Sequence, residues 1–131
     1  MTLKDAIDSI DSLKPNSYNN SEKVDWLSEL DHMVRDLVID VHEGAPETPF
    51  AGYTLKGKDP GQQAIELAKT LIVGEPFDEI YLSWLESKID YYNRETISYN
   101  NTITRFNDTF SAYSNWYNRN HMPLGRRIVY Y

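Results

Sequence analysis

The chain contains neither glycine nor proline over residues 77–120, FDEIYLSWLESKIDYYNRETISYNNTITRFNDTFSAYSNWYNRN, and so permits a long helix there. Apolar and aromatic residues recur along it at alternating steps of four and three residues, as they do in a coiled-coil seam. The seam consists of Leu85, Ile89, Tyr92, Thr96, Tyr99, Ile103, Phe106, Phe110, Tyr113 and Tyr117. This pattern predicts helix over residues 77–120, with Pro76 in the first turn.

A single helix over this whole range would be about 66 Å long. A compact domain of this chain length has a radius of gyration of about 14 Å. The helix must therefore break, project from the domain, or pack against other copies. The weak helix formers Asn93 and Asn100-Asn101 are the predicted break points. We expect residues 121–131 to form a flexible tail.

The N-terminal half predicts two further helices. Residues 2–14 carry an apolar stripe, with Thr2 as N-cap and Asp5 completing a capping box. The stripe consists of Leu3, Ala6, Ile7, Ile10 and Leu13. Residues 22–42 form the second, with Ser21 as the expected N-cap. Its apolar stripe consists of Leu27, Leu30, Val34, Leu37 and Val41. The short link between the two helices favours an antiparallel hairpin.

Residues 43–76 predict a loop-rich insertion between the helical regions. Glycine and proline recur through the loop 43–61, and Phe50 and Tyr53 are placed to anchor it against the body. Residues 62–73 are ambiguous: their first part fits a helical turn or two, and Leu71-Ile72-Val73 fits a short extended piece.

The expected fold is therefore all-α and forms a single domain. An N-terminal helical hairpin packs on a long, broken C-terminal helix, with the 43–61 loop and the flexible tail outside the bundle. The predicted core places one set of apolar residues against another. The first set is Leu27, Leu30, Val34 and Leu37, and the second is Leu85, Ile89 and Phe106.

Composition excludes several classes of protein. The 131 residues include no cysteine, which excludes disulfides, thiolate zinc sites and a cysteine nucleophile. No apolar run is long enough for a membrane span, and the N-terminus does not fit a signal peptide. The net charge of −7 argues against a general nucleic-acid binder. Most of this negative charge lies in residues 1–60. The uneven distribution reflects either a solvated surface or a basis for head-to-tail contact between copies.

No catalytic or metal-binding pattern stands out. His32 with Asp36, or His42 with Glu43, offers at most two ligands, whereas a metal site needs three or four. Surface histidines are therefore the expectation. The carboxylates fall on polar helix faces, and no phosphate-binding loop or nucleophile elbow is present. We expect no enzyme activity, no metal and no cofactor.

The aromatic stripe of residues 77–120 has two interpretations. Such a stripe usually belongs to a core, but tyrosine and tryptophan are also enriched at subunit interfaces. Trp84 and Trp116 lie beside the seam and are candidates for the second role.

Three stretches carry a resemblance to a known family: WLSELDHMVRDLVIDVHEG at 26–44, FAGY at 50–53, and the aromatic segment from residue 71 to Pro123. Over residues 3–123 the chain resembles the head–tail connector, or head-completion, proteins of tailed phages and prophages. Relatives often read L-V-P-E-P before the aromatic helix, where this chain has Gly74 in place of the first proline.

The resemblance implies a helical adaptor that self-associates into a ring below the portal and frames the DNA channel. Its implied partners are the portal protein and a tail-side adaptor, with no cofactor, no specific nucleic-acid binding and no membrane. It would be found in the host cytoplasm during assembly and then in the virion. The candidate interface residues are Phe50, Tyr53, Trp84, Trp116, Arg126, Arg127, Tyr130 and Tyr131. The alternatives are another minor capsid or tail-side structural protein, and a soluble phage regulatory protein that binds a host target.

Overall fold

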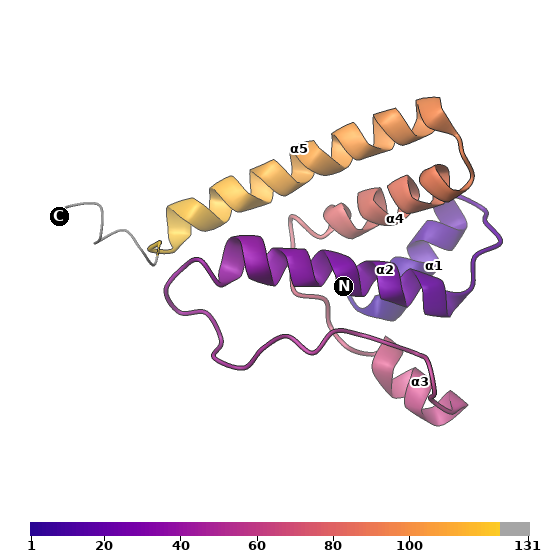
Figure 1. The fold of residues 1–131 in the computed structure, drawn as a ribbon, viewed down its shortest axis with the longest axis horizontal. Coiled ribbons are helices and arrows are strands. Elements are labelled where there is room, and N and C mark those ends of the chain that lie inside the picture. Colours follow the sequence, from indigo (N-terminus) through magenta and orange to yellow (C-terminus); the bar gives the residue numbers. More distant parts are fainter. Residues whose placement is uncertain (124–131) are drawn as a thin grey trace.

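The computed structural model of the protein describes residues 1–123 and is built from helices (Figure 1). Within residues 1–123, sheet-like pairing is limited to two isolated bridges, Thr2 with Thr70 and His42 with Pro123. The predicted all-α fold is confirmed. The helices are α1 (Leu3–Leu13), α2 (Asn20–Val34), η1 (Arg35–Ile39), α3 (Pro60–Leu67), α4 (Glu79–Tyr92) and α5 (Thr96–Asn120).

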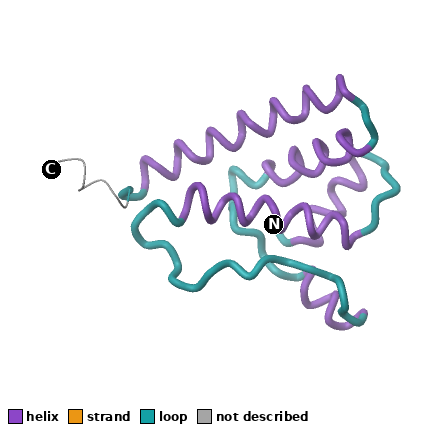
Figure 2. Tube along the Cα trace, viewed as in Figure 1, coloured by secondary structure: helices purple, strands orange, loops and turns teal. Residues whose placement is uncertain are grey.

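The predicted long helix is broken into two antiparallel helices, α4 and α5, that lie side by side (Figures 1 and 2). The break falls at residues 93–95, where Arg94 adopts a left-handed backbone with φ of 59°. The predicted break at Asn93 is therefore confirmed, whereas the one at Asn100-Asn101 is wrong. Both of those asparagines are exposed within α5, where packing on α4 outweighs their weak helix propensity.

The start of α4 differs from the prediction. Pro76 does not lie in its first turn, because the amide of Phe77 donates to the carbonyl of Gly74 in a tight turn and the helix begins only at Glu79. The segment before it, from Thr70 to Gly74, forms no strand and places Leu71 and Val73 in the core.

The helix α1 has the predicted cap and buried stripe, except that the prediction of Leu13 in that stripe is wrong. The Thr2 hydroxyl accepts from the Asp5 amide at 3.2 Å, and the Asp5 carboxylate accepts from the Thr2 amide at 3.1 Å, which completes the capping box. The helix ends before Pro15, and Leu13 is exposed in its last turn. The buried stripe consists of Leu3, Ala6, Ile7 and Ile10.

The helix α2 begins two residues before the predicted start. Asn19, not Ser21, is the N-cap, and its side-chain oxygen accepts from the Glu22 amide at 2.9 Å. Asparagine and serine are comparable N-caps, so the earlier residue takes the role and Ser21 falls inside the first turn. Both α1 and α2 pack against α4.

The end of this helix contains one π turn, η1, in which the Asp40 amide donates to the carbonyl of Arg35 at 2.8 Å. The extra residue rotates the following side chains by about 100° relative to a regular α-helix. Val38 and Ile39 are therefore buried, while Leu37 is 61% exposed. The predictions that Leu37 belongs to the core and Val41 to the buried stripe are wrong for this reason.

The insertion 43–76 is a loop up to Asp59 and then forms α3, which lies at the edge of the bundle and contacts α1 (Figure 1). Asp59 and Gln62 cap this helix reciprocally, and Pro60 occupies its first position. The helical turn or two predicted for the first part of residues 62–73 is thus confirmed. Six of the seven predicted core residues are buried: Leu27, Leu30, Val34, Leu85, Ile89 and Phe106.

Candidate functional site

A carboxylate lies at the centre of the core. Asp31 of α2 is fully buried, and each of its oxygens accepts hydrogen bonds. The Tyr81 hydroxyl donates to one oxygen at 2.6 Å, while the Tyr53 hydroxyl at 2.6 Å and the Ile72 amide at 3.2 Å donate to the other. The Tyr81 hydroxyl also accepts from the Val73 amide at 2.7 Å. We call these residues the Asp31 cluster.

The Asp31 cluster joins α2, the 43–59 loop, the segment before α4, and α4 itself. Burial raises the pKa of the Asp31 carboxyl above its ordinary value, although the three donors act in the opposite direction. Burial beside this carboxyl also raises the pKa of the Tyr53 and Tyr81 hydroxyls. Because these polar groups bind one another inside the core, the cluster serves to fix the loop to the helices.

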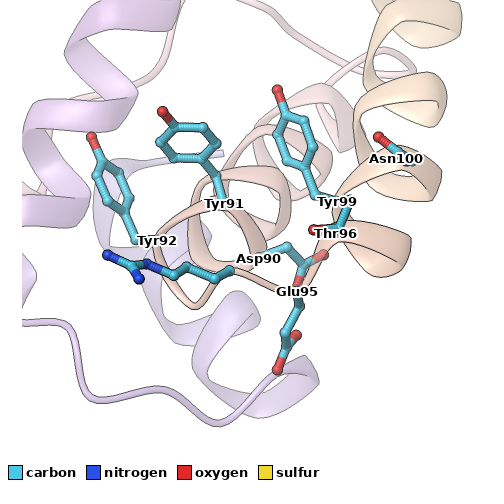
Figure 3. Close-up of a pocket in the computed structure, with 8 residues that line it drawn as sticks. Asp90, Tyr91, Tyr92, Glu95, Thr96, Tyr99 and Asn100 are labelled. Atoms are coloured by element: carbon cyan, nitrogen blue, oxygen red, sulfur yellow. The ribbon is translucent and has the colours of Figure 1, made fainter.

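A groove of about 640 Å³ lies at the turn between α4 and α5 (Figure 3). We call it the tyrosine groove, because the rings of Tyr91, Tyr92 and Tyr99 stand side by side with their hydroxyls pointing the same way. Arg94, Glu95 and Thr96 of the turn line it as well. The groove exists because the helix break interrupts the aromatic seam and leaves its rings without a helix to cover them.

In the tyrosine groove Tyr91 and Tyr92 are exposed and Tyr99 is half-buried, and the three rings contact one another in sequence. Tyr91 is 59% exposed, and its ring centroid lies 5.2 Å from that of Tyr92 and 5.6 Å from that of Tyr99. Tyr92 stacks on the buried Trp26 at 5.6 Å, which fixes the groove to α2. No described residue accepts or donates a hydrogen bond at the three groove hydroxyls. An exposed, preformed aromatic surface of this kind is typical of a protein interface.

Charged residues brace the floor of the groove. Asp90 is fully buried and binds the ammonium of Lys14, which also lies 3.5 Å from Glu95. The Thr102 hydroxyl donates to the other Asp90 oxygen at 3.1 Å. Burial lowers the pKa of Lys14, but the two carboxylates outweigh it and raise that pKa overall. Arg94 is exposed and has no carboxylate partner within residues 1–123.

A second aromatic cluster lies at the other end of α5. Phe77, Tyr113, Trp116 and Tyr117 surround a hollow of about 280 Å³ that His121 closes by stacking on Tyr117 at 3.7 Å. Burial raises the pKa of Tyr113 to about 12. This cluster joins the end of α5 to the segment before α4.

His42 contradicts the expectation of surface histidines. It is buried, its Nδ1 contacts the carbonyl of Val38, and its Nε2 lies 2.6 Å from the side-chain oxygen of Asn118. It thereby ties η1 to α5. Among residues 1–123, no three histidine or carboxylate side chains converge as a metal site would require.

The structure separates the predicted interface residues. Tyr53 and Trp84 are 7% and 8% exposed and belong to the core, so their assignment to an interface is corrected. Trp84 is held there by its indole N–H, which donates to the carbonyl of Trp26 at 2.7 Å. Phe50 is half-buried between His32 and Tyr53, which anchors the loop as expected. Trp116 remains 38% exposed. The other four predicted residues, Arg126, Arg127, Tyr130 and Tyr131, lie outside the described range.

The candidate interface residues did not include the tyrosine groove, although a signal for it was present. Tyr91, Tyr92 and Tyr99 flank the predicted break at Asn93. Aromatic residues on both sides of a helix break cannot all stay on one buried seam, so some of them must reach the surface.

Comparisons with protein-family models, with curated proteins and with solved structures found no match. None of the helices within residues 1–123 combines the length and the apolar character that crossing a membrane requires. Evidence for the function therefore comes from the tyrosine groove and the residues around it.

Proposed function

We propose that this chain is a virion assembly protein, a head–tail connector adaptor that forms a ring below the portal of a tailed phage. The resemblance of residues 3–123 to that family suggests the role. The chain would be a structural protein with no enzymatic activity. It would act in the host cytoplasm during assembly and then remain in the virion.

The observation that carries the proposal is the tyrosine groove, a preformed aromatic surface that no other part of residues 1–123 covers. A second, different aromatic surface around Trp116 lies at the opposite end of α5 (Figure 1). Two unlike surfaces at opposite ends allow identical copies to join head to tail, and such contacts generate rings when the rotation between copies closes.

The charge of the chain fits a channel that DNA crosses. Binding of DNA scales with the number of phosphates neutralised, and a net charge of −7 opposes such binding. The outer side of α5 offers uncharged polar side chains such as Asn100, Asn101 and Thr104, which are exposed. A ring with this character would let DNA slide past without holding it.

The experiment is electron microscopy of the purified full chain mixed with the portal protein of its own phage. We expect a ring of added density below the portal. Failure to bind the portal would overturn the proposal. Presence in particles without a portal-bound ring would favour another minor capsid or tail-side component, and absence from purified particles would favour a regulatory protein.

A matched pair of variants sharpens the experiment. Trp116→Ala removes an exposed ring from the aromatic surface at the end of α5, and we expect it to weaken binding to portal or neighbour. Ile65→Gln changes an apolar side chain of α3 that is still more exposed but lies in neither aromatic surface, and it should bind as the unmodified chain does.

A further inference from the structure

The chemistry of the tyrosine groove defines what can fill it. The exposed rings of Tyr91 and Tyr92 and the half-buried ring of Tyr99 offer flat apolar faces, and their hydroxyls offer donors that no described residue uses. Arg94 adds a positive charge that has no carboxylate partner within residues 1–123, whereas Glu95 is already held by Lys14. The matching ligand therefore has apolar rings or methyl groups, backbone carbonyls to accept from the hydroxyls, and one free carboxylate.

The loop after η1 contains a segment with these properties. Residues 46–49, Pro-Glu-Thr-Pro, are all exposed, and we call them the acidic tip. Its two prolines supply rings and carbonyls but no amide hydrogens, which suits a surface rich in hydroxyl donors. Glu47 has no cationic partner within residues 1–123.

The acidic tip is fixed in position by Arg35 of η1. The guanidinium of Arg35 donates to the carbonyls of Pro46 at 3.4 Å and Thr48 at 2.9 Å, while its Nε binds Asp40 at 3.1 Å. On the far side, the half-buried Phe50 packs between His32 and Tyr53. A segment that is already ordered loses less entropy on binding than a free loop does.

The acidic tip cannot fill the groove of its own chain. The loop that carries it leaves α2 and η1 at one end of the bundle, and the α4–α5 turn lies at the opposite end (Figures 1 and 2). Only a second copy can bring the two surfaces together. The contact would be heterologous, with unlike surfaces on the two copies, so each copy keeps one free groove and one free tip for further neighbours.

We propose that the acidic tip of one copy docks in the tyrosine groove of the next copy, with the prolines against Tyr91 and Tyr99 and Glu47 paired with Arg94. This inference rests on the proposed ring-forming adaptor and names the surfaces through which its copies join. The partner is a second copy of this chain, not a separate peptide.

Cross-linking tests the contact directly, because the natural sequence has no cysteine. One chain carries Glu47→Cys and the other Arg94→Cys, and an equal mixture is treated with a short bismaleimide reagent, both in solution at high concentration and on purified portals. We expect a cross-linked pair in the mixture and little with either variant alone. The control replaces Glu47→Cys by Asp108→Cys, an exposed acidic position on α5, and should give no product.

Charge reversal provides a second measurement that does not depend on cross-linking geometry. We expect Glu47→Arg alone, or Arg94→Glu alone, to weaken self-association by about tenfold, as measured by sedimentation equilibrium. The double variant should restore most of the loss because the pair is re-formed with reversed sign. Circular dichroism of each variant checks that the helices are intact.

The outcomes separate this inference from the proposed function. A 47–94 cross-link in solution without portal binding would support the contact and overturn the adaptor role. Portal-bound rings without a 47–94 cross-link, or without recovery in the double variant, would overturn the contact and leave the adaptor role standing. Cross-linking of Arg94→Cys to a chain carrying Arg126→Cys in its place would show that the C-terminal segment fills the groove, which also overturns the contact.

Discussion

Removing one hydroxyl from the core should show how much the Asp31 cluster contributes to stability. The Tyr81 hydroxyl donates to Asp31 at 2.6 Å and accepts from the buried Val73 amide at 2.7 Å. Tyr81→Phe removes a hydrogen bond to a charged group, at a cost of about 1.5–3 kcal/mol, and leaves the Val73 amide unpaired, at a further cost of about 1–3 kcal/mol. We therefore expect the free energy of unfolding to fall by about 2.5–6 kcal/mol.

Tyr53→Phe is the matched control. The Tyr53 hydroxyl also donates to Asp31 at 2.6 Å, but no backbone amide depends on it. Its removal should therefore cost only about 1.5–3 kcal/mol. Both variants are measured by urea denaturation followed by circular dichroism, and an unchanged m-value shows that the same surface is exposed on unfolding.

The difference in destabilisation between Tyr81→Phe and Tyr53→Phe tests whether the Val73 amide depends on the Tyr81 hydroxyl. If Tyr81→Phe destabilises the chain no more than Tyr53→Phe, then the Val73 amide is not bound to the Tyr81 hydroxyl and the relay from amide to phenol to carboxylate is wrong. A loss below about 1 kcal/mol for both would show that the Asp31 carboxylate does not depend on these donors.

Three further predictions test other features. Leu37→Ala should change the free energy of unfolding by less than about 0.5 kcal/mol because Leu37 is exposed, whereas Val38→Ala should lower it by about 1–3 kcal/mol because Val38 is buried. Equal effects of the two variants in urea denaturation would contradict the π turn. Because burial raises the pKa of Asp31, the folded chain keeps this proton to higher pH than the unfolded chain. The free energy of unfolding should therefore decline as the pH rises from 3.8 through the folded-state pKa, and a pH series on Asp31→Asn should lack this component. Gly52→Ala should lower the free energy of unfolding by about 2–4 kcal/mol, because Gly52 has a φ of 84° and the new methyl group would lie 2.7 Å from the Ser28 hydroxyl. A decrease below about 1 kcal/mol in urea denaturation would contradict this close contact between Gly52 and Ser28.

Periodicity predicted α1, α2, α4 and α5 well because each of them buries apolar side chains along one face, whereas α3 buries only Glu66. The capping box of Thr2 and Asp5 and the break near Asn93 follow from local chemistry that is visible in the sequence. The π turn could not be predicted in this way. Residues 35–39 continue the same apolar pattern, and the tertiary packing of η1 buries Val38 and leaves Leu37 exposed.

The interface could be predicted only in part. Sequence reasoning favoured large aromatic side chains, but it had no means to tell which ones the fold would bury. Trp84 finds a backbone carbonyl inside the core and Tyr53 finds a carboxylate, so both stay there. The exposed rings of the tyrosine groove result from the way the chain turns at Arg94, a tertiary feature that no single residue encodes.

The π turn also has a geometric meaning for an assembly. Arg35 opens η1 and its guanidinium holds the acidic tip, so the direction in which the tip points depends on a single extra residue in the helix. Under the proposed docking, deleting that residue would rotate the start of the loop by about 100° around the helix axis relative to Arg35, and so change the direction of the tip. The angle between neighbours, and with it the number of subunits in a closed ring, would then be set by helix length rather than by contact chemistry. Related chains could thus evolve rings of different size through one insertion or deletion.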